Sequence, residues 1–528
     1  MLKQLFALFL ICFFISSDAQ SKIDVLSYSF AIELNDDNNT IKGLARISFI
    51  AKETVTSFSF DLSNPNKVRK GMTVSNAGFN APNSSKPTFK HEADKITIDC
   101  QQSINKGDST SVFIQYDGIP SDGLIISKNK YGHRTFFADN WPNRGHHWLP
   151  CVDDPSDKAA VEFIVTAPQY YQVVANGILV EETNLKDGKK RTHWKEDVPV
   201  ASKVMVIGVA EFAVNLAGVI DNCIPVYSWV YPEDRDKGFY DYAQAVEIIP
   251  FFIKNVGPYG YKKLANVQSK TTFGGLENAN TIFYHENSIT GNRSSETLLS
   301  HEIAHQWFGN MATEKSFAHI WLSEGFATYM TILYMENKHG ADTARNILED
   351  ARQQVLAFAQ TNEHPVVDDT KDYMELLNAN SYQKGGWILH MLRRQLGDSI
   401  FWKSIRSYYA AYAGKNADTK DLQHIFEKVS GKDLSTFFQQ WLYTPGIPKL
   451  GVSWSYLANE KKISITIKQL QKNPFSFPLE LQLKNKTKTI NVSKQEETFV
   501  IPVQEKPAQL VLDPKLSLLF MATVTEKK

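Results

Sequence analysis

The chain has 528 residues, of which 43% are hydrophobic and 22% are charged, close to the averages of globular proteins. The length suggests about three domains, and the composition excludes a disordered chain or a fibrous repeat. Lysine plus arginine and aspartate plus glutamate each total 57, so no net charge would draw the chain to nucleic acid or to an anionic membrane.

The first residues have the pattern of a secretory signal. Lys3 precedes an apolar run at residues 5–15, and the small-residue sequence SDA follows at 17–19, which is typical of cleavage after Ala19. The run is too short to cross a hydrocarbon core of about 30 Å. The sequence therefore predicts a signal peptide at residues 1–19, a secreted, periplasmic or extracellular protein, and no stable membrane anchor.

Residues 20–214 are expected to form an all-β N-terminal domain. Short apolar runs such as YSFAIELN, ITIDC and YQVVANGILV alternate with polar residues and are separated by Asn, Gly, Pro and Asp. This is the pattern of β-strands joined by turns.

The pattern changes near residue 215 and changes back near residue 445. Between them lie long helical patterns that include ETLLSHEIAHQWFG, WLSEGFATYMTILYMENKHG and TARNILEDARQQVLAFAQ, so residues 215–444 are expected to be mainly helical. Beyond YTPGIPKLGVSW, the runs KISITIKQL and LELQLKN again alternate with period two. They predict a small β-domain at residues 445–528.

The stretch HEIAHQWFGN, residues 301–310, contains a candidate metal site. His301 and His305 are four residues apart, so on a helix both imidazoles project from one face and can reach the same metal ion. Glu302 is turned about 100° away, where its carboxylate can take a proton from a water activated by the metal. The same residues also fit an amphipathic helix with two hydrogen-bonded histidines, so the motif alone leaves both interpretations open.

A third candidate ligand follows on a second helical pattern, HIWLSEGFATYMTILY. Glu324 is separated from His305 by residues 306–323. Two imidazoles and one carboxylate leave one position of a tetrahedral zinc ion open, as in catalytic rather than structural zinc sites. The sequence therefore predicts one Zn²⁺ per chain, held by His301, His305 and Glu324, although Glu324 considered alone would be a surface acid.

This spacing and its flanks, HQWFGN and WLSEGFATY, resemble the zinc signature of the gluzincin zinc aminopeptidases, the family that includes aminopeptidase N and the leukotriene hydrolase. The family usually has asparagine at the position of Ser323. The segment HHWLPCVDDPSDKAAVEFIVTAP extends the resemblance into the N-terminal domain. The resemblance implies a multidomain α+β fold with a saddle-shaped β-domain, a thermolysin-like, mainly helical catalytic domain and a C-terminal β-sandwich, without the helical C-terminal domain of larger members.

The segment FGGLENANTIFY resembles the family's Gly-x-Met-Glu-Asn element, with leucine in place of methionine. In the family this strand pairs with the peptide backbone, and its glutamate binds the free α-amine. A buried carboxylate that needs an ammonium partner would turn away internal peptide bonds. The resemblance therefore implies substrate-binding roles for Gly274, Gly275, Leu276, Glu277 and Asn278.

The segment NSYQKGGWILHML resembles the family's Tyr-x-Lys-Gly sequence, whose tyrosine hydrogen-bonds the oxyanion of the tetrahedral intermediate. This implies that Tyr382 is a catalytic residue beside Glu302. A phenol at that place stabilises charge that develops only in the transition state, so its loss should reduce turnover more than binding.

Asp139 is a further candidate for substrate binding. Counted back from Pro150 without gaps, it occupies the position at which the family usually has a glutamine in contact with the substrate amine, and Trp141 stands where some members have an acid. Asp139 is expected to act as a second amine anchor or to favour a basic first residue. The alternative is an exposed loop aspartate without a role in binding.

Together these residues predict a zinc metallo-aminopeptidase that removes the N-terminal residue from peptides with a free N-terminus. A gluzincin hydrolase of a non-peptide epoxide would keep the same zinc ligands and amine-side carboxylate, so it remains an alternative. An inactive peptide-binding or scaffold member is another, although such members lose zinc ligands. The GGLEN element disfavours an endopeptidase.

Overall fold

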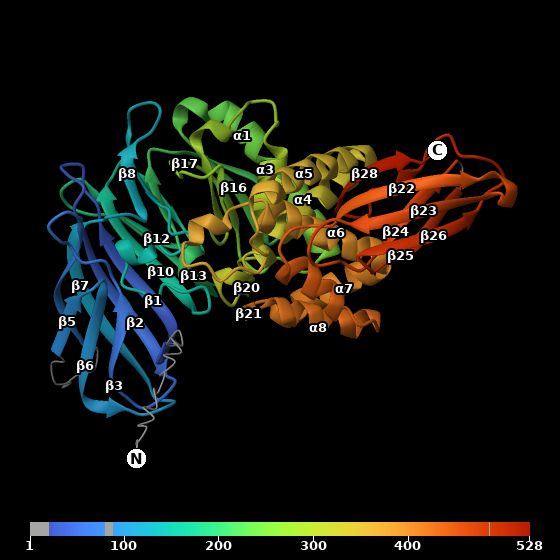
Figure 1. The fold of residues 1–528 in the computed structure, drawn as a ribbon. Coiled ribbons are helices and arrows are strands. Elements are labelled where there is room, and N and C mark those ends of the chain that lie inside the picture. The colour runs from blue at the N-terminus through green and yellow to red at the C-terminus, as the bar shows by residue number, and fades with distance from the viewer. Residues whose placement is uncertain (1–20, 80–87, 485, 528) are drawn as a thin grey trace, which may run out of the picture.

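The structure is a computed structural model that describes residues 21–527 except residues 80–87 and 485. The predicted signal peptide lies outside the described residues. The described chain forms three consecutive parts: sheets at the N-terminal end, a mainly helical part in the middle, and further sheets at the C-terminal end (Figure 1). Among the described residues, no helix has the length and hydropathy needed to cross a lipid bilayer.

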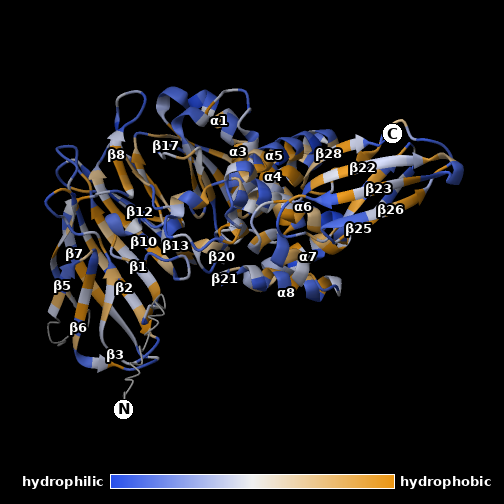
Figure 2. Cartoon of the chain, in the orientation of Figure 1, coloured by the Kyte–Doolittle hydropathy of each residue, from blue (hydrophilic) through white to orange (hydrophobic). Residues whose placement is uncertain are grey.

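The N-terminal part is built from strands, as predicted. Its central seven-stranded sheet buries alternate residues; strand β2 (Ile41–Ala51) exemplifies this pattern, and the alternation is visible in Figure 2. Two smaller sheets of three and four strands accompany it. In chain order the other strands are β1 (Ile23–Glu33), β3 (Val55–Asp61), β4 (Gly71–Phe79), β5 (Thr88–Glu92), β6 (Lys95–Ile104), β7 (Ser109–Ile119), β8 (Leu124–Lys128), β9 (Arg134–Ala138), β10 (Lys158–Pro168), β11 (Gln172–Ala175), β12 (Ile178–Asn184), β13 (Lys189–Ala201) and β14 (Ile207–Ala210).

The middle part contains the predicted helices. Its long helices pack around a core that includes Trp307, Trp321 and Trp387, all fully buried. The α-helices are α1 (Arg235–Tyr242), α2 (Ala245–Asn255), α3 (Glu296–Ala304), α4 (Trp321–His339), α5 (Ala341–Thr361), α6 (Gly385–Leu396), α7 (Asp398–Tyr412), α8 (Thr419–Ser430) and α9 (Ser435–Phe438).

A five-stranded sheet in the middle part was not expected from the sequence. Its order is β15 (Ala213–Ile220), β16 (Ile224–Val230), β17 (Leu264–Ser269), β19 (Thr281–His285) and β18 (Gly275–Leu276). Every residue of β17 is buried, so the period-two pattern that reveals a half-exposed strand is absent. Strand β18, which contains part of the GGLEN segment, is the edge strand next to β19.

The C-terminal part forms two small sheets, with the strands expected there. One sheet contains β22 (Lys449–Leu457), β23 (Lys462–Gln469), β26 (Glu496–Pro502) and β28 (Met521–Glu526), and the other contains β24 (Phe477–Leu483), β25 (Lys486–Val492) and β27 (Val511–Leu512). A short two-stranded sheet of β20 (Ala312–Glu314) and β21 (Lys415–Ala417) lies within the middle part.

The N-terminal part forms hydrogen bonds to residues that follow the GGLEN and HEIAH motifs. Lys158 donates to the carbonyl oxygens of Asn310 and Met311 at 3.0 and 2.9 Å, and the Asn176 amide donates to the carbonyl of Ala279 at 2.7 Å. The N-terminal part thus helps to position the residues that follow the GGLEN and HEIAH segments.

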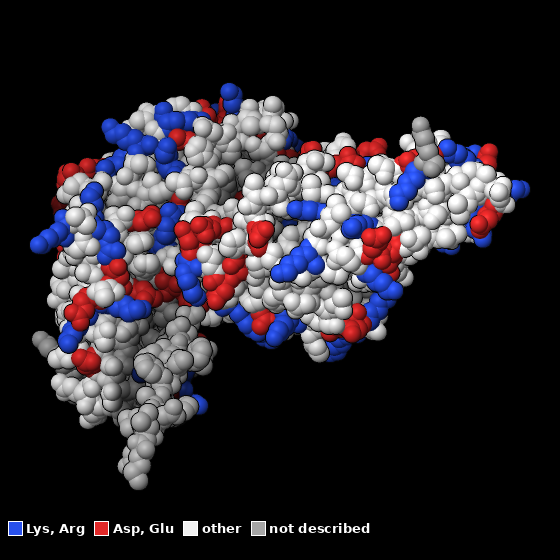
Figure 3. Space-filling model, in the orientation of Figure 1, with Lys and Arg blue, Asp and Glu red and all other residues white. Residues whose placement is uncertain are grey.

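The face shown in Figure 3 carries acidic and basic side chains mixed together, in keeping with the zero net charge.

Candidate active site

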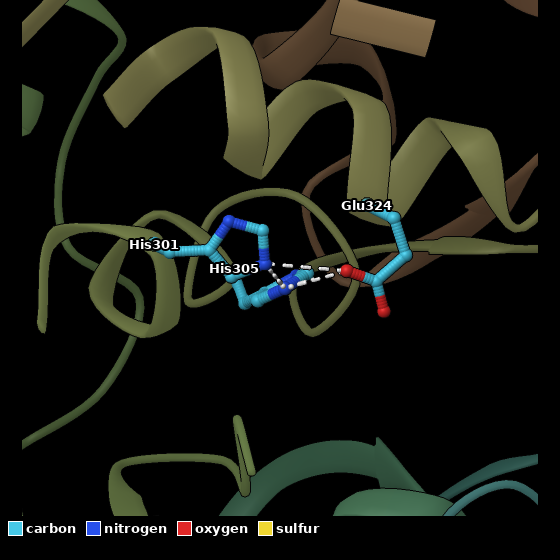
Figure 4. Close-up of side chains that lie close together, drawn as sticks. All are labelled: His301, His305 and Glu324. Carbon is cyan, nitrogen blue, oxygen red and sulfur yellow. Dashed lines mark hydrogen bonds and ion pairs between the residues drawn. The ribbon is translucent and has the colours of Figure 1, made fainter. Parts of the chain in front are cut away.

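The three predicted metal ligands meet in one place. His301 lies on α3, His305 directly follows that helix in helical conformation, and Glu324 lies in the first turn of α4. Their side chains point toward one another (Figure 4). The two Nε2 atoms are 3.1 Å apart, and Glu324 Oε2 lies 3.3 Å from His301 Nε2 and 3.2 Å from His305 Nε2.

These separations fit a zinc ion. A tetrahedral ion with ligand distances of about 2.0–2.1 Å separates its ligand atoms by about 3.3–3.4 Å. The three atoms form a nearly equilateral triangle close to that size, and the donor set is the one found in catalytic zinc sites. The amphipathic-helix alternative for the two histidines does not account for this convergence of three potential ligands on one point.

The second ring nitrogen of His305 has its own partners. His305 Nδ1 lies 3.1 Å from the carbonyl oxygen of Phe308 and 3.0 Å from Ser323 Oγ. A carbonyl oxygen only accepts, so the bond to Phe308 requires the proton on Nδ1 and leaves the Nε2 lone pair free for a metal. Ser323, which departs from the family's usual asparagine, therefore contacts a metal ligand.

Burial sets the protonation of the two glutamates beside the histidines. Burial raises the pKa of Glu302 well above its ordinary value, and the charge of nearby carboxylates adds to this rise. Burial also acts to raise the pKa of Glu324, but His305 and His301 outweigh it and hold that pKa below its usual range. The pKa values of the two carboxyl groups are thus shifted in opposite directions. The protonated form is favoured at Glu302, and the charged form is favoured at Glu324.

Tyr382 lies beside His301. Its ring stacks on the imidazole with a centroid distance of 5.9 Å, and it belongs to a π-helical turn, Asn380–Lys384, a rare conformation that is frequent at functional sites. Burial raises the pKa of Tyr382 well above its ordinary value, with contributions from the nearby glutamates. The phenol therefore stays protonated and able to donate a hydrogen bond.

Two glycines bring the segments of Glu324 and Tyr382 together. A Cβ atom on Gly325 would lie 2.8 Å from the Cα of Gly385, so any larger residue would force the first turn of α4 away from the start of α6. The close backbone contact is what places the carboxylate of α4 and the phenol of the π-helical turn in one cleft.

The GGLEN segment lines the same cleft as the candidate metal ligands. The Glu277 carbonyl oxygen accepts hydrogen bonds from Asn310 at 2.6 Å and from Gln306 at 3.0 Å. The Glu277 side chain is only 5% exposed, and its Oε1 atom has no hydrogen-bond partner among the described residues. Such a buried, unpartnered carboxylate oxygen is a binding position for a cation or a hydrogen-bond donor.

Gly275 lies directly beside Glu302. A Cβ atom at that position would overlap the Glu302 carboxyl group. The edge strand and the predicted proton carrier are therefore in contact, which is possible only because residue 275 lacks a side chain.

These residues line a cleft of about 250 Å³. Of the predicted site residues, it contains Gly274, Gly275, Leu276, Glu277, His301, Glu302, His305, Glu324 and Tyr382. Asn278 is buried but is not among the lining residues. Trp141, Phe273, Leu298 and Leu377 complete the lining.

The sequence alone did not reveal that several of these residues line or support the cleft. Leu298 and Leu377 have no motif of their own and reach the cleft only through the fold. Phe273 is the first residue of the FGGLENANTIFY segment, so its position next to the GGLEN element was the signal. Gln306 and Asn310, which hold the Glu277 carbonyl, lie within HQWFGN, so the motif itself contained that signal. Trp307 and Phe308, the two aromatic residues of HQWFGN, are both fully buried and belong to the core.

Asp139 lies elsewhere than the sequence suggested. Its side chain is 0% exposed, so it is not an exposed loop residue, and it is not among the residues that line the cleft. The carboxylate forms an ion pair with Arg144 and lies 3.3 Å from the Thr272 amide nitrogen. Burial raises the pKa of Asp139 and the Arg144 guanidinium counteracts that rise. The carboxylate thus faces other protein groups in the structure, and its direct contact with the substrate amine stays a prediction.

Comparison with known proteins agrees with the geometry. A model of the Peptidase M1 N-terminal domain matches residues 25–204, and a model of the Peptidase family M1 domain matches residues 240–441. The chain is 26% identical over 429 residues to a probable aminopeptidase 2 of Sulfurisphaera tokodaii, with 76% of this chain and 53% of the relative covered.

Other relatives show the same pattern. A leucyl aminopeptidase of Saccharolobus solfataricus is 24% identical over 73% of this chain and 52% of its own length, and aminopeptidase M1-D of Oryza sativa is 29% identical over 58% and 36%. The chain thus spans about half or less of the length of these relatives. The two matching family models are consecutive and together cover most of the chain. The cluster of His301, His305 and Glu324 lies within the second model. The chain therefore belongs to the M1 peptidase family, whose aminopeptidases are metallopeptidases.

Proposed function

We propose that the protein is a zinc aminopeptidase that removes the N-terminal residue of peptides. The observation that carries this proposal is the unpartnered Oε1 atom of buried Glu277, which lines the same cleft as the three candidate metal ligands. A hydrolytic site that also presents a lone buried carboxylate is suited to a substrate that brings its own cation, and a peptide's free N-terminus is such a cation.

The residues of the cleft have distinct roles in this proposal. A zinc ion held by His301, His305 and Glu324 would polarise the scissile carbonyl and activate water. Glu302 accepts the proton of the attacking water and passes it to the leaving amine, and its raised pKa suits it to holding that proton between the two steps. Tyr382 donates a hydrogen bond to the oxyanion.

The edge strand and Glu277 hold the substrate. Strand β18 pairs with β19 on one side only, so its other side offers backbone groups to an extended peptide. The Glu277 carboxylate binds the α-ammonium group. This contact places the first peptide bond, and not a later one, beside Glu302. The same binding would exclude acetylated N-termini, because they carry no charge.

The alternatives have less support. A non-peptide hydrolase would use the same metal ligands, but the relatives compared above are named aminopeptidases. An inactive scaffold has no need of converging metal ligands, and all three converge here. We also infer from the pattern of residues 1–19 that the protein is secreted; a mature chain that begins at Gln20 in mass spectrometry of the exported protein tests this.

One experiment tests the proposed activity. Purified protein of known zinc content is assayed on aminoacyl-anilides and on N-acetylated counterparts, before and after removal of the metal by a chelator and again after zinc is restored. We expect cleavage only of anilides with a free amine, lost with the metal and regained with zinc. Cleavage of the acetylated compounds indicates an endopeptidase, and zinc-loaded protein that cleaves neither contradicts the proposal.

A further inference from the structure

The loop that follows β9 contacts the segment that leads into the substrate-facing edge strand. Asp139, the first residue of this loop, is completely buried. Its Oδ2 atom accepts from the Thr272 backbone amide and from Thr271 Oγ1, both at 3.3 Å. These two threonines lie directly before Phe273 and the GGLEN segment, so the N-terminal domain holds the start of the substrate-binding wall through one carboxylate.

Arg144 connects this carboxylate to two aromatic residues of the cleft. Its guanidinium forms ion pairs with Asp139 and with Asp122, and its Nε donates to the carbonyl oxygen of Trp141 at 2.7 Å. The guanidinium carbon also lies 5.7 Å from the centre of the Phe273 ring, within the range of a cation–π contact. One partly buried cation therefore contacts the Trp141 backbone, the Phe273 ring and the Asp139 carboxylate together.

The two aromatic rings line the cleft side by side. Trp141 and Phe273 meet edge to face with a centroid distance of 5.8 Å, and Leu298 and Leu377 line the cleft with them. All charged residues among the lining belong to the metal site or to Glu277. Apart from the Tyr382 phenol, the remaining side chains of the lining are apolar. Asp139, the nearby acid that would attract a basic side chain, is already paired with Arg144.

We propose that the Asp139–Arg144 pair is a positioning pair that holds Phe273 and Trp141 in place and leaves a pocket for an uncharged, apolar first side chain. This inference rests on the proposed aminopeptidase function and specifies its substrate class. It assigns to Asp139 an indirect role, through the placement of the 271–275 segment, in place of contact with the substrate amine.

The test is a set of variants assayed on leucyl-, phenylalanyl- and arginyl-anilides, with KM and kcat determined separately. The set contains D139N, R144Q, the double variant D139N/R144Q and the conservative variant R144K. D94N is the matched control, because it makes the same substitution in the Arg69–Asp94 pair of the same domain, which does not line the cleft. Thermal unfolding of every variant separates loss of folding from loss of binding.

The wild type is expected to favour the leucyl and phenylalanyl substrates over the arginyl one by about tenfold or more in kcat/KM. D139N and R144Q should each raise KM for the apolar substrates by roughly tenfold with a much smaller change in kcat, because a displaced wall weakens ground-state and transition-state binding alike. The double variant should resemble the single ones, since the two residues act as a unit. R144K should fall between wild type and R144Q, and D94N should match wild type.

Three results would overturn the proposal. A wild-type preference for the arginyl substrate contradicts the apolar pocket. A normal KM in R144Q with a raised KM in D139N indicates direct contact of Asp139 with the substrate amine. R144K keeps the positive charge and should fold even where D139N does not. A wild-type KM in R144K contradicts positioning by the guanidinium group. Failure of the wild type on every free-amine anilide instead refutes the proposed function.

Discussion

Asp241 and Glu277 are both buried carboxylates of the middle part of the chain, but their oxygens have different surroundings. The Asp241 carboxylate on α1 accepts hydrogen bonds from the backbone amides of Thr290, Gly291 and Arg293 at 2.6, 2.7 and 2.9 Å. Glu277 Oε1 has no partner among the described residues. The difference shows that burial alone does not identify a functional acid; an unpartnered oxygen on a buried acid that also lines the cleft is the better indication.

The first way to sharpen this comparison is to replace the carboxyl group of a third buried acid, Glu302, whose pKa is raised by burial. Glu302→Gln should lower kcat by about 10²–10⁴-fold, because a general acid–base group contributes about that much. The bound zinc, measured by atomic absorption, should stay at the wild-type level since the glutamate is not a ligand. An active, zinc-loaded Glu302→Gln enzyme would refute its assignment as the base.

Glu277→Gln tests the unpartnered member of the pair. We expect KM for a leucyl-anilide to rise by roughly 100-fold, since a charge-assisted contact to an ammonium group is worth about 2–3 kcal/mol. The melting temperature should be unchanged or higher, because the substitution removes a buried charge whose Oε1 atom has no hydrogen-bond partner among the described residues. A lower melting temperature with an unchanged KM would assign Glu277 to structure.

Asp241→Asn makes the matching change in the partnered acid and should have the opposite outcome. Its carboxylate holds the loop that leads into α3, so the loss of charge-assisted bonds should lower the free energy of unfolding by about 3 kcal/mol. Urea unfolding measures this change. Steady-state assays well below the melting temperature should show an almost unchanged KM, and an increase like that of Glu277→Gln would contradict the contrast between the two acids.

Asp157, in the N-terminal domain, extends the comparison to pH. Burial raises its pKa to about 7, and its Oδ1 atom has no hydrogen-bond partner among the described residues. The unfolded value is about 3.9, so between about pH 4 and pH 7 the folded chain binds the extra proton, and the contribution of this group to stability falls as the pH rises through that window.

Asp157→Asn should therefore change stability little at pH 4 and increase it by about 4 kcal/mol at pH 8, where the buried charge is removed. Urea unfolding at several pH values measures this. Asp37→Asn, at an exposed position of the same domain, serves as the control and should leave the pH profile of the wild type unaltered. A constant difference between Asp157→Asn and wild type at all pH values would contradict the raised pKa.

The smallest effect is expected at Ser323, which contacts the metal ligand His305. Ser323→Ala should weaken zinc binding by about threefold to tenfold, below the usual 10–100-fold loss for such outer partners, because the Phe308 carbonyl still accepts from Nδ1. Competition with a chelating dye measures the zinc affinity. Ser300→Ala is a matched control, since the hydroxyl of Ser300 is buried on the same helix as His301 and has no partner among the described residues; an equal loss there would show a packing effect.

Most of the candidate metal site was predictable because its geometry is local. The four-residue spacing of His301 and His305 places both rings on one helical face whatever the rest of the chain does. Glu324 came from the spacing of a second helix, and the structure brings it to the same point. The long helices were predicted for a similar reason, since a strong 3.6-residue pattern persists over many residues.

What depends on contacts between distant segments was decided only by the tertiary structure. The fully buried strand β17 has no alternation to reveal the sheet of the middle part. The contact of Gly325 with Gly385, which brings Tyr382 to Glu324, joins two helices far apart in the sequence.

Asp139 shows the limit most clearly. The sequence alone predicted the candidate metal ligands, the candidate proton carrier and the resemblance to a peptidase family, because these predictions depend on short motifs and their spacing along the chain. Whether Asp139 faces the substrate or the protein depends on Arg144, Thr272 and the packing of two domains. Local sequence patterns do not encode such long-range pairing of a buried charge, since its cost and its compensation arise only when the chain is folded.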